Sequence, residues 1–163
     1  MESTITIDNK EYSLCYKGIT ILTYREAFRS DLTLDLNASQ KRTFNAINKR
    51  RENILSTFEN VDDISGEELE EILNMSDEEA ITLIVESVSP EQLEKFTWAC
   101  IKSKADLGGK QFPNYKQFLS QIDDYGSFIG ACVVVYNEMI YGNKQLVEAE
   151  EDETKENVKK NMM

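Results

Sequence analysis

The chain has 163 residues with a formal net charge of -12, 40% apolar residues, three cysteines and no histidine. A chain of this length typically forms one domain with a sizeable core. The absence of histidine excludes Ser-His and Cys-His nucleophile pairs, imidazole general bases and histidine metal ligands. The composition is typical of an acidic, soluble globular protein and argues against most classes of enzyme.

The N-terminal residues alternate between apolar and polar side chains, which is the period-two pattern of a β-strand. The apolar positions are Ile5, Ile7, Tyr12, Leu14 and Tyr16. Asp8-Asn9-Lys10 separates the two runs and has the composition of a tight turn. The pattern predicts a β-hairpin over residues 3–16.

The next segment combines a helical pattern with a shorter alternating one. Spacings of three and four predict a helix over residues 18–29. Its expected face consists of Ile21, Leu22, Arg25 and Phe28. Leu32, Leu34 and Leu36 then alternate with polar residues, which predicts a third short strand or an ordered extended loop.

Helical signals dominate the middle of the chain. A stripe of apolar residues predicts a long helix over residues 39–59. Three serines, each followed three positions later by Glu or Gln, fit the capping box that opens a helix. These serines are Ser65, Ser76 and Ser89, and they predict helices over 66–74, 77–88 and 90–106.

Two further apolar stripes predict helices over residues 114–122 and 124–141. The second is apolar most of the way round, which is typical of the central, buried helix of a domain. Together the elements predict a mainly α protein, a bundle of about six helices with a small N-terminal β-hairpin (α+β), in a single globular domain spanning 1–142. Residues 143–163 are acidic and poor in apolar side chains, which predicts a disordered tail.

Charge is distributed unevenly along the chain. Residues 1–51 carry nine basic and six acidic side chains, whereas residues 59–94 carry thirteen acids and no base. The predicted helix over 39–59 holds a basic patch made of Lys41, Arg42, Lys49, Arg50 and Arg51. Nucleic acid is not an expected partner, because a body of net charge -12 repels a polyanion. The patch is expected to pair with the chain's own acidic segment or with an acidic protein partner.

The other chemistry-bearing residues indicate no catalytic, cofactor or metal site. Cys15, Cys100 and Cys132 are far apart and form no CxxC pair, so they are expected to be reduced core thiols. The acids at Asp62 and Asp63 do not match a calcium-binding loop, and the glycines form no phosphate-binding motif. No secretory signal and no apolar run of membrane-spanning length is visible, so we expect a cytoplasmic protein with no membrane partner.

Aromatic residues are the most suggestive candidates for partner contacts. Within one predicted helix-loop-helix lie Trp98, Phe112, Tyr115, Phe118 and Tyr125. Such residues either fill a core or anchor a partner. Core packing is expected for Phe96, Phe118 and Phe128. Both alternatives stay open for Trp98 and Tyr115. The candidate partner-binding residues are Trp98, Phe112, Tyr115, Tyr125, Arg50 and Arg51.

The chain also carries a tryptophan-bearing amphipathic segment, a short polar break and a segment with an aromatic-x-x-Phe-Leu pattern. These segments are Phe96-Thr97-Trp98-Ala99-Cys100-Ile101-Lys102-Ser103-Lys104-Ala105-Asp106 and Phe112-Pro113-Asn114-Tyr115-Lys116-Gln117-Phe118-Leu119. The arrangement resembles the tail assembly chaperones of long-tailed bacteriophages and prophages, and the hairpin from Ile5 to Tyr16 looks like the family's usual start. The acidic stretch from Glu59 to Glu94 departs from the family's pattern.

The resemblance implies a non-enzymatic chaperone that binds the tape measure protein, a very long helical chain with apolar segments, and delivers it to the tail tube protein. It implies a location in the bacterial host cytoplasm and absence from the finished virion. Many family members also have a longer, frameshifted form, and Lys159-Lys160-Asn161 is compatible with slippery codons. Self-association is left open.

Two rival classes remain. One is a generic acidic interaction adaptor or an antitoxin-like regulatory protein, which the acidic surface fits equally well. The other is an enzyme without histidine that uses Asp, Glu, Lys or Ser, which would require a deep pocket with perturbed ionisable groups.

Overall fold

The computed structural model describes residues 2–58 and 64–142. Within these ranges the protein is mainly α, with a two-stranded hairpin followed by seven helices, so the predicted fold class is confirmed. The elements in chain order are β1 (Glu2–Ile7), β2 (Lys10–Cys15), α1 (Gly18–Phe28), α2 (Leu32–Leu55), α3 (Gly66–Leu73), α4 (Asp77–Val88), α5 (Pro90–Leu107), α6 (Tyr115–Ser120) and a helix over residues 125–142. The predicted tail over 143–163 lies outside the described residues.

The hairpin forms as the alternation predicts. Its antiparallel register pairs Ile5 with Tyr12 and Ile7 with Lys10. Asp8 and Asn9 form the two-residue turn with φ of 50° and 64°, the left-handed conformation that matches the twist of a hairpin. The Asp8 carboxylate also accepts hydrogen bonds from the backbone N–H groups of Asp123 and Asp124, at 2.8 and 3.1 Å. The tip of the hairpin therefore holds the segment that leads into the 125–142 helix.

The face that α1 buries differs from the predicted one. The buried residues of α1 are Thr20, Thr23 and Tyr24, whereas Leu22 is 44% exposed. A buried threonine is tolerated because its hydroxyl is satisfied: Thr20 Oγ1 donates to the Cys15 carbonyl at 3.0 Å and lies 2.8 Å from Ser103 Oγ. The prediction gave weight to aliphatic side chains, whereas the buried face of α1 carries two hydrogen-bonded threonine hydroxyls and the ring of Tyr24.

The strand or extended loop predicted around Leu32, Leu34 and Leu36 is wrong, because this segment is the beginning of α2. The side chain of Asp31 accepts a hydrogen bond from the Leu34 N–H at 3.1 Å and caps the helix. Leu32 and Leu36 are fully buried one turn apart, and Leu34 is 68% exposed. The helix predicted over 39–59 therefore begins earlier, and it ends at Leu55.

The serine caps confirm the helix starts in the middle of the chain. The side-chain oxygens of Ser65, Ser76 and Ser89 each accept a hydrogen bond from the backbone N–H three residues later. Ser89 closes α4 and opens α5 with a φ of 92°, a left-handed conformation that a serine rarely adopts. A single residue thus makes the sharp change of direction between these two helices.

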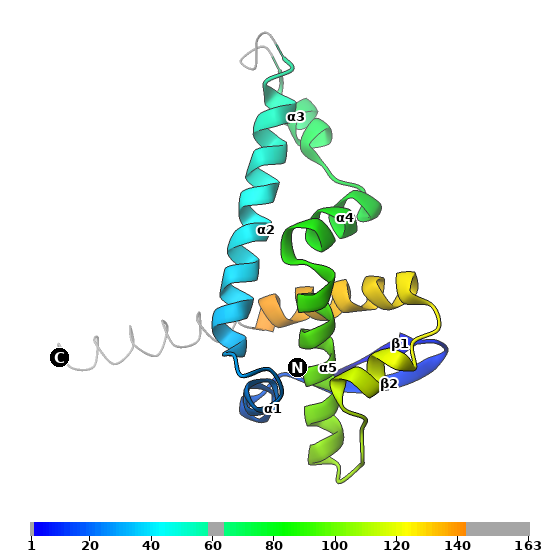
Figure 1. Cartoon of the computed structure of the whole chain (residues 1–163). Helices are drawn as coiled ribbons and strands as arrows, with labels where there is room; N and C mark the ends of the chain where they lie inside the picture. The colour runs from blue at the N-terminus through cyan, green and yellow to red at the C-terminus, as the bar shows by residue number, and fades with distance from the viewer. Residues whose placement is uncertain (1, 59–63, 143–163) are drawn as a thin grey trace, which may run out of the picture.

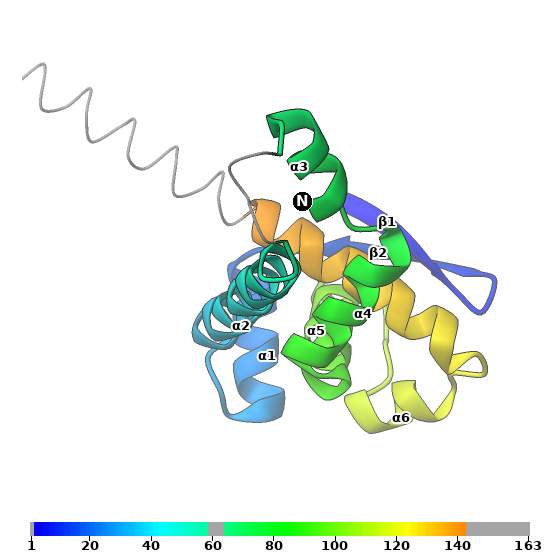
Figure 2. The ribbon, with the colours of Figure 1, turned by 90° about the horizontal axis from the view of Figure 1, so that it is seen from above.

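The core lies around α5 and the 125–142 helix. Helix α5 packs against α1, β2, α4 and α6, and the 125–142 helix crosses it (Figure 1). Phe96, Phe128 and Met139 are fully buried, and Phe118 is 1% exposed, so the predicted core phenylalanines and the predicted buried helix are confirmed. Seen from above, α1 and α2 lie on one side of α5 and α6 lies on the other (Figure 2).

The three cysteines are free and buried, as the sequence predicts. Burial raises the pKa of Cys132 to about 12, and burial also raises the pKa of Cys100. Both thiols are therefore protonated near neutral pH, which is the unreactive form of cysteine.

Candidate functional site

The structure divides the six candidate residues between two places. Four aromatic candidates lie together around α5 and α6: Trp98 on α5, Phe112 before α6, Tyr115 on α6 and Tyr125 at the start of the 125–142 helix. Arg50 and Arg51 lie on α2.

Trp98 belongs to the core rather than to a partner-binding surface. Its side chain is 4% exposed, and the indole N–H donates a hydrogen bond to the backbone oxygen of Pro113 at 3.0 Å. The ring packs edge-on against Phe28, with 5.5 Å between the ring centroids. The prediction of a partner contact at Trp98 is corrected accordingly, because the groups that would contact a partner are already covered.

Tyr115 and Tyr125 are both bound to one buried acid. The Tyr115 hydroxyl donates to Glu94 Oε2 at 2.9 Å, and the Tyr125 hydroxyl donates to the other carboxylate oxygen, Glu94 Oε1. Glu94 is 8% exposed. Burial, followed by the bond to Glu94, raises the pKa of Tyr125 to about 12, and the same causes raise the pKa of Tyr115. Of these two tyrosines, Tyr125 is the more exposed, at 50%, and offers part of its ring to a partner.

Phe112 lies at the edge of a small cleft between β2 and the C-terminal end of α5. Its ring is half-buried and lies 5.3 Å from the ring of Phe118 and 6.1 Å from that of Tyr12, measured between centroids. The cleft has a volume of about 300 Å³. Phe112 therefore supports the packing of the hairpin and contributes one edge to a shallow depression.

Arg50 ties α2 to the segment between α3 and α4. Its guanidinium donates to the backbone oxygens of Leu73 and Asn74, at 2.9 and 3.4 Å, and forms an ion pair with Glu79 at 2.9 Å. The predicted pairing of the basic patch with the chain's own acidic segment is thereby confirmed at Arg50. Arg42, by contrast, donates to the backbone oxygen of Ser87, and Arg51 is exposed.

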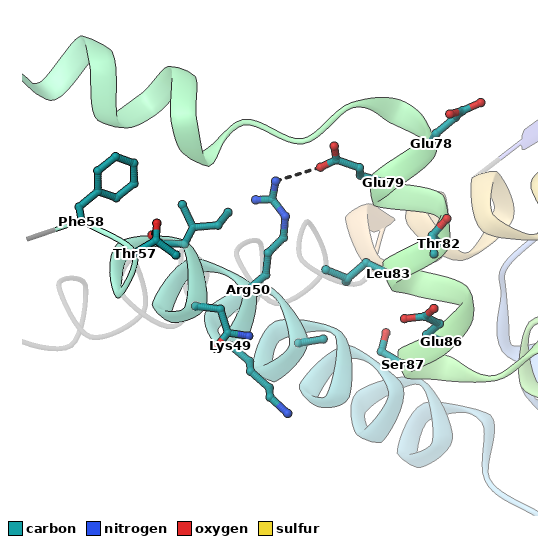
Figure 3. Close-up of a pocket in the computed structure, with 13 residues that line it drawn as sticks. Lys49, Arg50, Thr57, Phe58, Glu78, Glu79, Thr82, Leu83, Glu86 and Ser87 are labelled. Atoms are coloured by element: carbon teal, nitrogen blue, oxygen red, sulfur yellow. Dashed lines mark hydrogen bonds and ion pairs between the residues drawn. The ribbon is translucent and has the colours of Figure 1, made fainter.

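An open groove runs between α2 and α4 beside Arg50 (Figure 3). We call it the α2–α4 groove; its volume is about 980 Å³. It is lined by Ala46, Lys49, Arg50, Asn53, Ile54, Thr57, Phe58, Glu78, Glu79, Thr82, Leu83, Glu86 and Ser87. Apolar side chains occur on both walls: Ile54 and Phe58 on the side of α2, and Leu83 on α4. Figure 1 shows that α2 extends past α4 toward α3.

The two walls of the groove carry opposite charges. The charged residues from α2 that line it, Lys49 and Arg50, are both basic. Those from α4 are all acidic, namely Glu78, Glu79 and Glu86. Among the described residues the structure pairs Arg50 with Glu79 and gives the other three no ion-pair partner. The groove therefore presents an apolar surface between a basic and an acidic border.

Comparison of the chain with protein-family models, curated proteins and solved structures gives no match. In the part of the chain that the structure describes, no group of three or more His, Cys, Asp or Glu side chains is placed to hold a metal ion. No helix in residues 2–58 and 64–142 has the length and apolar character that crossing a membrane requires.

The sequence reasoning missed two features of this surface. From the sequence, the α4 wall is assigned only to the acidic segment over residues 59–94, although Leu83 lies four residues after Glu79 and therefore on the same side of the helix. Glu94 is counted only as one of the thirteen acids of that segment, and no local signal marks its burial, because both tyrosines that cover it come from later parts of the chain.

Proposed function

We propose that the protein is a non-enzymatic tail assembly chaperone that binds and solubilises a phage tape measure protein and recruits the tail tube protein. The observation that carries the proposal is the α2–α4 groove, an open surface with apolar side chains on both walls. Grooves of this kind receive the apolar face of an amphipathic helix. The resemblance of residues 96–119 to this family of chaperones supports the same conclusion.

The mechanism follows from the surface of the protein. A long helical protein with apolar segments aggregates when those segments meet. A chaperone that covers one apolar segment prevents that segment from contacting another. The net charge of -12 then makes the complexes repel one another, which keeps them soluble. Release to the tail tube protein requires that this coverage be reversible, which suits a groove open to solvent.

The non-enzymatic part of the proposal is supported by the state of the nucleophilic side chains. The Cys100 and Cys132 thiols and the Tyr115 phenol have raised pKa values, so each keeps its proton at neutral pH. Nucleophilic catalysis requires the opposite change, an activated or deprotonated group.

Co-expression tests the proposed function. A helical tape measure fragment that is insoluble when expressed alone is expected to enter the soluble fraction together with the full chain and to co-purify with it. A net-acidic protein of similar size serves as the control for charge alone. A fragment that stays insoluble in the company of the chain contradicts the proposal.

The location is tested separately. As a chaperone, the protein acts in the host cytoplasm and is left out of the mature virion. Mass spectrometry is expected to detect it in infected or induced cells and not in purified particles. Stoichiometric amounts in purified virions would make it a structural tail component instead.

An acidic adaptor or antitoxin-like regulator is the alternative, and the surface of α3 is the observation that favours it. Glu67, Glu70 and Glu71 line one side of that helix, and residues 64–94 contain no basic side chain. Such a surface fits a basic partner whose binding weakens steeply as salt increases. Binding of a tape measure segment through apolar contacts is expected to be far less sensitive to salt.

A further inference from the structure

The α2–α4 groove combines apolar walls with a fixed arrangement of charge. Lys49 and Arg50 border it on α2, and Glu78 and Glu86 border it on α4. We propose that it receives one amphipathic helix of the partner, whose apolar stripe is bordered by acidic residues on the side facing α2 and by basic residues on the side facing α4. This inference rests on the proposed function, because it specifies the segment that the chaperone recognises.

The length of the walls sets the length of the occupant. On α2 the helical part of the lining runs from Ala46 to Ile54, and on α4 it runs from Glu78 to Ser87. At about 1.5 Å per residue these walls are roughly 12 to 14 Å long. Two to three turns of a helix, or about ten residues, therefore fit along the groove.

The charge pattern also sets the direction of the occupant. A helix that carries acids on one border and bases on the other matches the groove in one direction only. If the acidic and basic borders are exchanged across the apolar stripe, the helix must lie in the groove with its N- and C-terminal ends exchanged. Lys49, Glu78 and Glu86 have no ion-pair partner among the described residues, so each is available to a charge on the occupant.

A second copy of the chain fits this pattern poorly. The exposed apolar pair on α2 is Phe44, 62% exposed, and Ile47, 38% exposed. At helical spacing its charged neighbours are Lys41 and Arg51, which are both basic. The Phe44–Ile47 face of a second copy therefore has no acidic border to pair with Lys49 on the α2 wall. A partner helix with one acidic and one basic border matches the groove better.

Three helix-stabilised synthetic peptides test the proposal on the full chain. All have the same leucine and alanine stripe; one has a Glu border and a Lys border, one has two Lys borders, and one has two Glu borders. Fluorescence anisotropy at about 0.15 M salt, which screens the net charge of -12 beyond roughly 8 Å, is expected to show the mixed peptide binding about fivefold more tightly than either of the others. Equal binding of all three would overturn the charge arrangement.

Charge reversal in the groove provides the sharpest comparison. Lys49→Glu is expected to narrow the preference for the mixed peptide over the peptide with two Lys borders, and Glu86→Lys to narrow it over the peptide with two Glu borders, because Arg50 and Glu78 keep part of each border. Lys41→Glu, which makes the same change in net charge on an exposed residue of α2 outside the groove, is the matched control and is expected to leave the preference unchanged. If Lys41→Glu and Lys49→Glu behave alike, the contact is not in the groove.

The apolar contact is tested by Leu83→Asp, with Ile81→Asp as the control on the same helix. Leu83 lines the groove, whereas Ile81 is 38% exposed outside it. We expect at least a tenfold loss of affinity for the mixed peptide with Leu83→Asp and little change with Ile81→Asp. Circular dichroism checks that both variants fold, and Lys49→Glu tests the same site should Leu83→Asp unfold. A dimer of the full chain that Leu83→Asp dissociates would show that the occupant is a second copy.

Co-expression separates this inference from the proposed function. If the wild-type chain and Leu83→Asp solubilise a tape measure fragment equally well, the chaperone function stands and the groove is not its binding site. If the wild-type chain fails to solubilise the fragment while the peptide preferences hold, the groove binds helices but the proposed function is wrong.

Discussion

Glu94 is a buried acid that has phenols rather than a base as its partners. It lies on α5 with Lys95 next in sequence, yet Lys95 pairs with Glu91 at 2.9 Å and lies over the ring of Phe28. Two O–H donors, from Tyr115 and Tyr125, satisfy the carboxylate instead. Hydrogen bonds to an ionised group are stronger than neutral ones, which lets a carboxylate be buried without a counter-ion. The arrangement fastens α6 and the start of the 125–142 helix to α5.

Replacing this carboxylate with an amide tests its contribution. Glu94→Gln keeps the shape of the side chain but replaces one carboxylate oxygen, which accepts a hydrogen bond from a tyrosine hydroxyl, with an NH₂ group, which cannot accept it. We expect the free energy of unfolding, measured by urea denaturation, to fall by about 1–2 kcal/mol. Glu91→Gln on the same helix is the control and should change it by about 0.5 kcal/mol or less, because Glu91 is exposed. Equal effects would show that the tyrosines are held by ring packing alone.

The tyrosines make the fold sensitive to alkali. Burial raises the pKa of Tyr12, Tyr16, Tyr24, Tyr115, Tyr125 and Tyr136 above the ordinary value of 10.0. Above that value the unfolded chain loses phenolic protons that the folded protein retains, so the free energy of unfolding falls as the pH rises. The loss begins near pH 10 and continues through about 12 for Tyr125.

A titration of absorbance at 295 nm checks this prediction. The folded protein is expected to ionise most of its tyrosines only as it unfolds, with the absorbance and circular dichroism transitions coinciding. In urea the same residues should titrate near pH 10. Independent ionisation of all tyrosines near pH 10 in the folded protein would contradict the phenol burial described above.

At the scale of single residues, regular spacing predicts burial well and long-range contact poorly. Phe96, Phe118 and Phe128 follow helical stripes, so their burial is evident from the sequence. Trp98 lies off the main stripe, and it is buried because Pro113 and Phe28 cover it. Such coverage depends on how separate segments meet, which the local pattern does not contain.

Among the elements, one side chain of α2 binds both α3 and α4. The guanidinium of Arg50 binds two carbonyls at the end of α3 and one carboxylate at the start of α4. A planar group with several fixed donors can do this, whereas a lysine has a single charged centre. Arg50 therefore joins the two walls of the α2–α4 groove (Figure 3).

Substitution of Arg50 tests this coupling. Arg50→Met removes the donors and keeps the aliphatic length, and it is expected to lower the free energy of unfolding by about 1–2 kcal/mol. Hydrogen exchange should rise most in α3 and at the start of α4, while α5 keeps its protection. Arg51→Met is the matched control, because Arg51 is exposed. Uniform acceleration throughout the protein would mean that Arg50 supports the whole fold instead.

Element prediction succeeded where a cap and a stripe agree and failed where they conflict. Ser65, Ser76 and Ser89 mark helices that the structure contains. At Leu32, the period-two pattern of leucines indicated a strand, whereas in the structure Asp31 caps a helix that begins there. The cap decides the outcome, because Leu32 and Leu36 also fit the spacing of a helix and pack into the core.

For the molecule as a whole, the basic and acidic segments that are separate in the sequence lie on opposite walls of the α2–α4 groove. The sequence predicts a basic patch and a base-free acidic segment, and α2 and α4 bring the two face to face. The apolar residues between them could not be anticipated, because the groove exists only once the elements are placed.

The stability of the domain is expected to reside in the described core rather than in residues 143–163.

Deletion of residues 143–163 tests that expectation. The sequence predicts no packed structure in this segment, so its removal should shift the melting temperature by about 2 °C or less. A scan of the truncated and full-length chains at the same salt concentration measures the difference. A drop much larger than this would show that the segment packs on the domain.

The position of the 125–142 helix in the chain also affects how the protein is made. Phe128, Tyr136 and Met139 fill the centre of the core, and Ser3 in β1 reaches Glu138 at 2.7 Å. The ribosome delivers this helix after all the elements that it covers. Until then the apolar faces of the hairpin and α5 remain open to other chains, a condition that favours aggregation. The nascent chain is therefore most prone to aggregate just before the 125–142 helix completes the core.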